Sequence, residues 1–151
     1  ERAKTLTDKQ LDTQIEKYQP APFSEPQHTL REMFHSHVSG KENWIAAIKN
    51  QHLPETLDKT ISGMIQRHEK AASDFLAIAH EIRDESKWQA VFVDAICIPP
   101  ETFSFSGVIA HVITFSAHQR MVMLNALREF GINDLGYGDP IEFERMLLVE
   151  G

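Results

Sequence analysis

The chain has 151 residues, which suits one compact domain, and its composition is that of an ordinary soluble globular protein: 42% hydrophobic and 25% charged. No apolar run approaches the roughly 20 residues that span a bilayer, and no leader-like pattern opens the chain, so we expect neither membrane insertion nor an intact secretion signal. Nucleic-acid binding is not expected either, because it depends on clustered Lys and Arg and the net charge is −7.

The single cysteine, Cys97, lies in an apolar stretch and cannot form an internal disulfide. A buried thiol is the simpler interpretation, because no activating base stands beside it in the sequence. One unpaired cysteine suits a reducing compartment, so the expected location is the cytoplasm.

The N-terminal part predicts a short capped turn, a connector and a first long helix. Residues 1–12 have the pattern of a helix end and a capped start, and prolines 20, 22 and 26 indicate an ordered connector. A helix is predicted from about Thr29 to Lys49, where Thr29 and Glu32 have the spacing of a capping box. Its apolar stripe consists of Leu30, Met33, Phe34, Val38, Trp44, Ile45 and Ile48, with His37 on the same line.

A second long helix is predicted to start near Pro54, a favoured first-turn residue, and to continue to roughly Asp84. His68 falls on its apolar line. A third helix is predicted from about residue 106 to just before Gly131, a natural helix stop, and a short one over about 140–148.

The segment from Trp88 to Phe105 is apolar but hard to assign. Its Val and Ile residues could form a strand, yet no other segment supplies a clear partner, and Pro99 and Pro100 stop regular structure. We interpret the segment as a long connector that packs across the helices and contains a helical turn.

These elements predict an all-α fold, a four-helix bundle within a single domain over residues 1–151. The first bundle helix would end at the N-terminus of the given chain and would be truncated there. The long connector would precede the last bundle helix.

Four of the eight histidines lie on predicted inward faces: His37, His68, His111 and His118. A buried imidazole needs a partner for at least one ring nitrogen. Each could be satisfied by a nearby polar group, or they could line a ligand pocket, or they could hold a metal. Because His111 and His118 are seven residues apart, about 10 Å along a helix, their spacing is poor for one metal.

Other charged residues favour structural interpretations. Lys41 and Glu42 read as a solvated charge pair, and Arg120 as a residue of the helix surface or of a dimer contact rather than an anion clamp.

Three segments in order resemble the DinB-like superfamily. Residues 29–34 followed by His37, Glu42 and Trp44 are similar to its second helix, and residues 4–12 to the junction after its first helix. Residues 107–120, followed by 127–131, are similar to its last bundle helix. The resemblance covers most of the chain.

The resemblance implies an up-down-down-up bundle that is commonly homodimeric. Many members bind a divalent metal through a histidine of the second helix and a His-x-x-x-His pair of the last, and some use the metal to activate a small thiol for transfer or isomerisation. By position the first ligand falls on His37, whereas the pair falls on Phe115 and Gln119, which are not histidines. A rearranged site of His37, His111 and His118 could still take Zn, Ni or Fe.

Two functions follow as hypotheses. The first is a metal-dependent thiol transferase or related enzyme with an altered metal site. The alternative is a non-catalytic dimeric bundle that binds a small molecule or another protein, with a pocket lined by His37, His68, Phe115 and Gln119.

Overall fold

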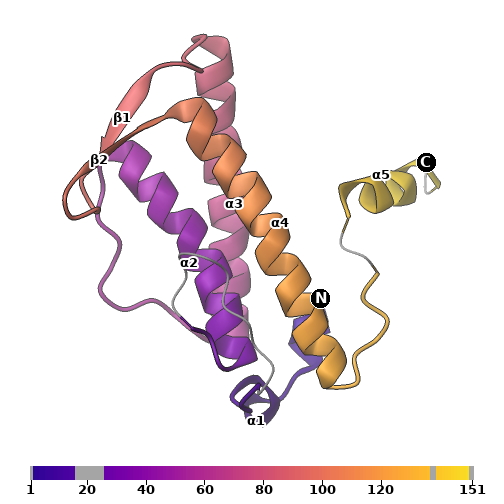
Figure 1. Ribbon diagram of the computed structural model, residues 1–151. Helices are drawn as coiled ribbons and strands as arrows, with labels where there is room; N and C mark the ends of the chain where they lie inside the picture. The colour runs from indigo at the N-terminus through magenta and orange to yellow at the C-terminus, as the bar shows by residue number, and fades with distance from the viewer. Residues whose placement is uncertain (1, 16–25, 137–138, 150–151) are drawn as a thin grey trace. The chain divides into compact units, whose positions relative to one another are not determined.

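The computed structural model describes residues 2–15, 26–136 and 139–149 (Figure 1). The protein is mostly helical, at 63%, which confirms the predicted helical class, whereas the four-helix course stays a prediction. The described elements are a 3-10 helix over Arg2–Thr5, α1 Asp8–Leu11, α2 Leu30–Lys49, α3 Ile61–Asp84, β1 Val91–Asp94, β2 Glu101–Ser104, α4 Phe105–Glu129 and α5 Pro140–Val149.

The chain divides into two compact units. The central unit is His35–Ser116, and the terminal unit is Glu1–Phe34 together with Ala117–Gly151. The boundaries between the two units fall within helices: one lies in α2, after Phe34, and the other in α4, after Ser116. The single domain over residues 1–151 stays a prediction.

The core of the central unit joins α2, α3 and the first part of α4. Its buried residues are Ile45, Ala71, Ile78 and Ile82, and Ile48, Phe75, Phe105 and Ile109 pack against them. Each of the isoleucine side chains contributes roughly 1.5–3 kcal/mol when it is fully removed from water. Burial of the apolar stripes therefore holds the three helices of this unit together.

The start of α2 confirms the predicted helix and its cap. The Thr29 hydroxyl accepts a hydrogen bond from the backbone N–H of Glu32 at 3.2 Å. The Glu32 carboxylate accepts in turn from the backbone N–H of His28 at 2.6 Å, one residue before the position that a regular capping box uses.

The start of α3 differs from the prediction, because the helix begins at Ile61 and not near Pro54. Thr60 is the N-cap: its hydroxyl accepts from the backbone N–H of Gly63 at 3.1 Å, and Asp58 accepts from the N–H of Thr60 at 2.8 Å. A Cβ at Gly63 would lie 2.2 Å from the Asp58 carboxylate, so a side chain there would displace this carboxylate from its present position.

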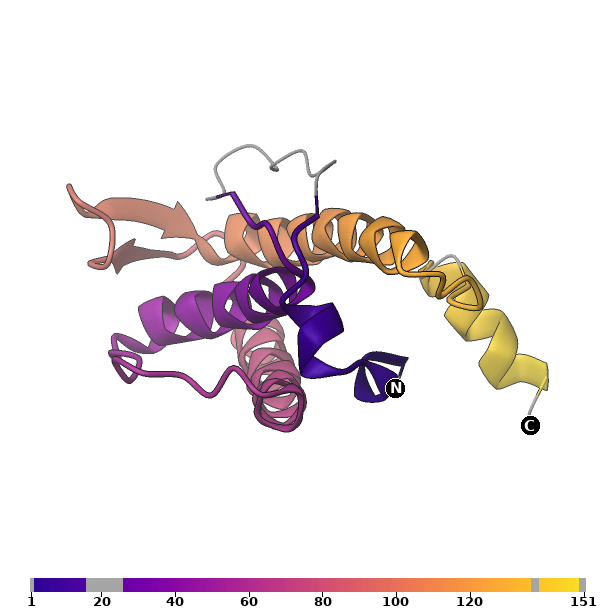
Figure 2. The ribbon, with the colours of Figure 1, turned by 90° about the horizontal axis from the view of Figure 1, so that it is seen from below.

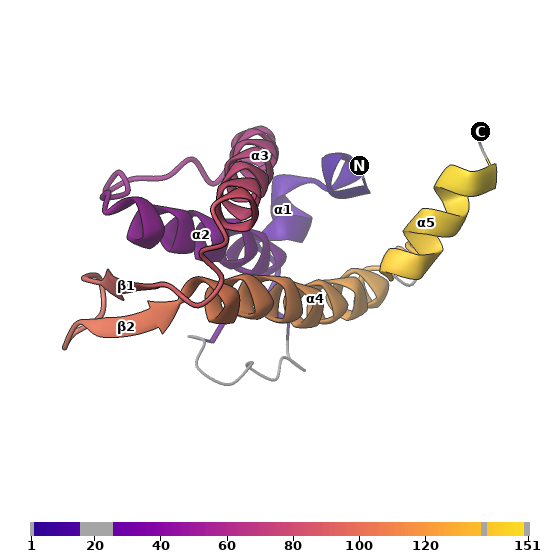
Figure 3. The ribbon, with the colours of Figure 1, turned by 90° about the horizontal axis from the view of Figure 1, so that it is seen from above.

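The segment between α3 and α4 is a β-hairpin, so the interpretation as a connector with a helical turn is wrong. Strand β1 pairs antiparallel with β2, in a register that places Val91 opposite Ser104 and Asp94 opposite Glu101. The partner strand that seemed to be missing follows Pro100 in the same segment. Figures 2 and 3 show the two strands side by side, with β2 leading directly into α4.

The last two predicted helices are confirmed as α4 and α5, with bounds within one residue of those expected. Gly131 follows α4 with a φ of +79°, in the left-handed region that glycine adopts without a steric penalty. The Asp139 carboxylate accepts from the backbone N–H of Ile141 at 2.7 Å and caps α5.

The N-terminal segment of the terminal unit is short and capped. Thr7 and Gln10 form a complete capping box at the start of α1. Arg31 of α2 binds Asp12 at 2.6 Å and Asp8 at 2.7 Å. Of the predicted proline connector, residues 16–25 lie outside the described part of the chain.

In the described ranges, no helix is both long and apolar enough to cross a bilayer.

Two glycine substitutions should have opposite effects on stability. Gly131→Ala should lower the free energy of unfolding by about 1 kcal/mol, because an L side chain is strained at that φ. Gly40→Ala should raise it by roughly 0.5–1 kcal/mol, because a Cβ there meets nothing within 4 Å and alanine favours the helix interior. Urea unfolding followed by circular dichroism measures both, and an equal effect at the two positions would contradict this account.

Candidate functional site

The four histidines predicted on inward faces do not share a buried position. His37 is half-buried, whereas His68, His111 and His118 are exposed, so the predicted core placement of these three is wrong. On α4 the buried line includes Val108, Val112, Met123, Ala126 and Leu127. A helical repeat continues that line through positions 115, 116 and 119, which are half-buried, and leaves positions 111 and 118 beside it.

His37 and His68 lie together, one on α2 and one on α3. Their ring centroids are 5.8 Å apart, with the planes tilted by 30°. The Lys41 ammonium lies 2.8 Å from Nε2 of His37 and donates to the His37 carbonyl at 3.0 Å. An ammonium group only donates, so Nε2 of His37 accepts from it and carries no proton. Loss of solvent, followed by the positive charge of Lys41, lowers the pKa of His68.

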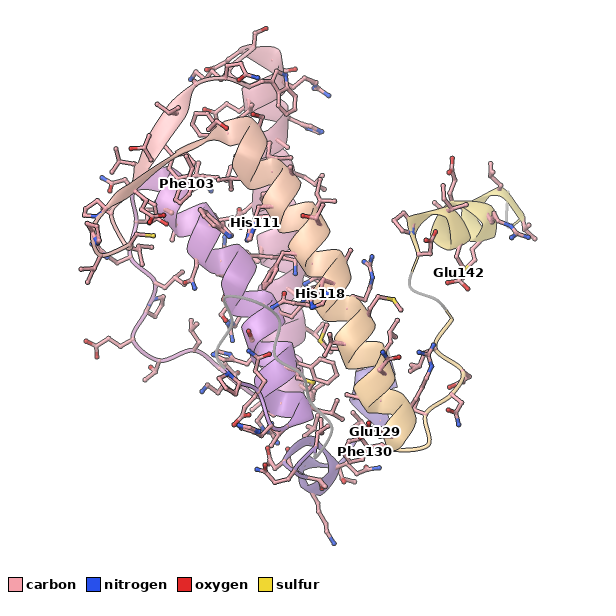
Figure 4. All side chains as sticks on the ribbon, viewed as in Figure 1. Phe103, His111, His118, Glu129, Phe130 and Glu142 are labelled. Carbon is pink, nitrogen blue, oxygen red and sulfur yellow. The ribbon has the colours of Figure 1, made fainter. Side chains whose placement is uncertain are left out.

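His111 belongs to an aromatic cluster formed by Trp44, Phe103, His111 and Phe115. The His111 ring stacks on Phe115 at 5.2 Å and meets the edge of Trp44 at 5.4 Å. Trp44 also meets Phe103 of β2 edge to face, at 5.4 Å. Figure 4 labels Phe103 and His111, which approach α2 from the hairpin and from α4. Packing within this cluster holds the hairpin against α2 and α4.

The predicted metal ligands have other contacts in this structure. Among the described residues, no three His, Cys, Asp or Glu side chains form a group that could hold a metal ion. Nε2 of His37 is engaged by Lys41, and the His111 ring is packed against aromatic side chains. The metal site of His37, His111 and His118 for Zn, Ni or Fe stays a prediction, as does the pocket lined by His37, His68, Phe115 and Gln119.

A cavity that sequence reasoning missed lies in the central unit, between α2, α3 and the loop that joins them. Its volume is about 320 Å³. Its lining residues are Glu42, Ile45, Ala46, Gln51, His52, Leu53, Pro54, Leu57, Arg67, Lys70, Ala71 and Asp74. Six of these are aliphatic residues or proline, and none carries a hydroxyl or a thiol.

An ion pair between Glu42 and Arg67 forms the polar wall of this cavity. The two side chains are only 15% and 14% exposed. Nε and Nη2 of Arg67 donate to the two carboxylate oxygens of Glu42 at 3.0 and 2.5 Å, a bidentate arrangement. Nη1 donates to the backbone carbonyl of Asp58 at 2.7 Å and lies 3.4 Å from Nδ1 of His35. The expected pairing of Glu42 with Lys41 is wrong, because Arg67 takes the carboxylate.

The second pair of charges at the cavity is more open to solvent. Lys70 donates to Asp74 at 2.6 Å, and Lys49 lies 4.0 Å from the same carboxylate. The hydrogen bond from Lys70 lowers the pKa of Asp74. In the described part of the chain, the side chains of Gln51 and His52 are the lining groups that make no hydrogen bond.

The character of this lining is mainly apolar, with its charges paired. Each of its four charged groups is paired with another, and its remaining polar groups are an amide and an imidazole at the edge of an apolar surface. Such a surface recognises apolar molecules that have one or two hydrogen-bonding groups.

Glu42→Gln should lower the free energy of unfolding by about 3 kcal/mol, because it leaves the Arg67 guanidinium largely desolvated without a counter-charge. The matched control is Asp74→Asn at the exposed pair, which should cost less than about 1 kcal/mol. Urea unfolding of both variants gives the comparison, and equal losses would show that the burial of the Glu42–Arg67 pair has no energetic weight.

Stability should fall as the solution is acidified below about pH 6.5. Burial, followed by the charges of Lys59 and Arg67, lowers the pKa of His35, and the charge of Glu42 opposes this shift. The pKa of His68 is also lowered, for the reasons given above, and the charge of Glu69 opposes that shift. Between the lowered pKa and 6.5 the unfolded chain binds more protons, so the stabilisation present above pH 6.5 is lost as the pH falls.

The slope of unfolding free energy against pH between 7 and 5.5 measures this effect. His35→Gln combined with His68→Gln should flatten it, and an unchanged slope would assign the effect to other groups.

No family model, no curated protein and no solved structure matches this chain.

Proposed function

We propose that this protein is a non-catalytic helical domain that binds a small, neutral and mostly apolar molecule in the cavity between α2 and α3. The observation that carries the proposal is the cavity itself, an apolar surface beside a fully paired ion pair. The alternative function expected from the sequence is a non-catalytic dimeric bundle that binds a small molecule or another protein. The proposal takes the first of these two kinds of ligand.

The size and surface of the cavity suit a small ligand. Its volume of about 320 Å³ lies at the lower end of the range of roughly 300–1,000 Å³ that is typical of ligand pockets. The apolar part comes from three elements: Ile45 and Ala46 of α2, Leu53 and Leu57 of the loop, and Ala71 of α3. A cavity of roughly 150 Å³ is enough to bind benzene, so this volume accommodates an aromatic ring or a short alkyl chain and leaves further space.

The charges of the lining favour a neutral ligand. Glu42 is neutralised by Arg67, and Asp74 by Lys70. A charged ligand would have to give up its hydration without finding a free counter-charge, which is unfavourable. A hydroxyl, amide or ring N–H on the ligand would instead find Gln51 and His52.

The metal-dependent thiol transferase, the homodimer and the cytoplasmic location stay predictions that rest on the sequence alone. The enzyme hypothesis depends on a metal held by His37, His111 and His118, which metal analysis tests. Zn, Ni or Fe bound at close to one equivalent in untagged protein would favour that hypothesis over the proposal.

Leu57→Trp should block the cavity, because the larger ring occupies the space that Leu57 lines. Indole and 1-hexanol are suitable probes, since both are neutral and mostly apolar and each has one hydrogen-bonding group. In the unmodified protein, titration followed by amide NMR should shift signals of Ala46, Gln51 and Ala71, and Leu57→Trp should weaken this binding at least tenfold.

The matched control is Leu76→Trp, the same substitution at a position that is 59% exposed on α3 and outside the cavity lining. It should bind both probes as the unmodified protein does. If the two tryptophan variants bind equally, or if the shifts are spread over the molecule, the cavity is not a binding site.

A further inference from the structure

A second cavity, in the terminal unit, has a lining of different character. It lies between α4, the loop that follows it and α5, and its volume is about 610 Å³. The residues that line it are Arg120, Asp134, Leu135, Gly136, Asp139, Pro140, Glu142 and Met146. Figure 4 labels Glu142 on α5.

Arg120 is a cation without a partner at this cavity. Its Nε is buried and makes no hydrogen bond, and it is the only buried side-chain nitrogen or oxygen of the described residues in that state. The guanidinium as a whole forms no ion pair within the described ranges. A buried N–H that lacks an acceptor is unfavourable, and native proteins almost always supply one. An acceptor on a bound ligand would satisfy it.

The three carboxylates of the cavity do not accept a hydrogen bond from Nε of Arg120. One oxygen of Asp139 caps α5, accepting from the N–H groups of Ile141 at 2.7 Å and Glu142 at 3.4 Å. Asp134 and Glu142 have other interactions and do not pair with Arg120. The lining therefore combines one unpaired guanidinium with three carboxylates.

This combination selects among ligand charges. A simple anion would satisfy Arg120 but would be repelled by three carboxylates, since the lining carries a formal charge of −2 from Arg120, Asp134, Asp139 and Glu142. A simple cation would be attracted by the carboxylates but would leave Nε of Arg120 without an acceptor. A molecule that carries both a carboxylate and an ammonium group meets both requirements.

We propose that this cavity binds a small zwitterion of the amino-acid class with an apolar side chain. The carboxylate of the ligand binds Arg120, as guanidinium groups bind carboxylates in general, and its ammonium group faces the acidic residues. Leu135, Pro140 and Met146 supply apolar surface for the side chain.

Local contacts hold the loop of this cavity in place. Arg128 of α4 donates to the Gly136 carbonyl at 3.3 Å and to the Asn125 side chain at 2.9 Å. Gly131 reverses the chain after α4 with its positive φ. Gly136 is therefore held by a contact that does not use Arg120.

Three probes that share one carbon skeleton test the proposal on the unmodified protein. They are leucine, 4-methylpentanoate, which lacks the ammonium group, and 3-methylbutylamine, which lacks the carboxylate. Isothermal titration at pH 7 should show leucine binding, with each of the other two at least tenfold weaker. No binding of leucine, or equal binding of 4-methylpentanoate, would overturn the zwitterion site.

Arg120→Gln should reduce leucine binding at least tenfold, and Arg145→Gln, on α5 but outside the lining, should leave it unchanged. Equal binding by the two variants would remove Arg120 from the site, and the probe comparison above does not depend on either variant folding. Leu57→Trp should leave leucine binding intact, so the failure of one cavity is distinguishable from the failure of the other.

Discussion

The ion pair between Glu42 and Arg67 is the contact on which the central unit's cavity depends. It joins α2 to α3 across 25 residues of sequence, and through the Asp58 carbonyl it also holds the loop between them. Two charges at 15% and 14% exposure have lost most of their hydration, and this arrangement is stable only when their hydrogen-bonding groups are satisfied. Arg67 meets that condition by donating from all three of its nitrogens. Glu42 and Arg67 both line the cavity, together with aliphatic residues of the two helices and the loop.

The two cavities differ in how their charges are balanced, and this difference decides what each is proposed to bind. At the α2–α3 cavity each charge already has a partner, so the remaining affinity is apolar and a neutral ligand fits. At the α4–α5 cavity Arg120 lacks an acceptor, so a ligand has to bring one. The same rule, that a desolvated polar group needs a partner, leads to opposite ligand classes at the two places.

The periodicity of the sequence predicted four buried histidines, and the structure shows three of them exposed. Seven residues fall short of two full helical turns by about 20°, so His111 and His118 share one side of α4. The sequence pattern predicted both side chains on the inward face, but the buried line of α4 passes beside them. Both side chains are exposed and His111 packs in an aromatic cluster, whereas their role as metal ligands stays a prediction. The resemblance to the DinB-like superfamily, and the chemistry that it implies, stays a prediction.

The sequence by itself determined what depends on neighbours within one or two helical turns: the helical class, the cap at Thr29, the stop at Gly131 and the short last helix. Those features arise from backbone hydrogen bonds and apolar repeats that are local to a segment. Only the tertiary structure decided the partner of β1, the pairing of Glu42 with Arg67 and the isolation of Arg120. These depend on which faces meet after the chain has folded back, and no spacing along the sequence encodes that meeting.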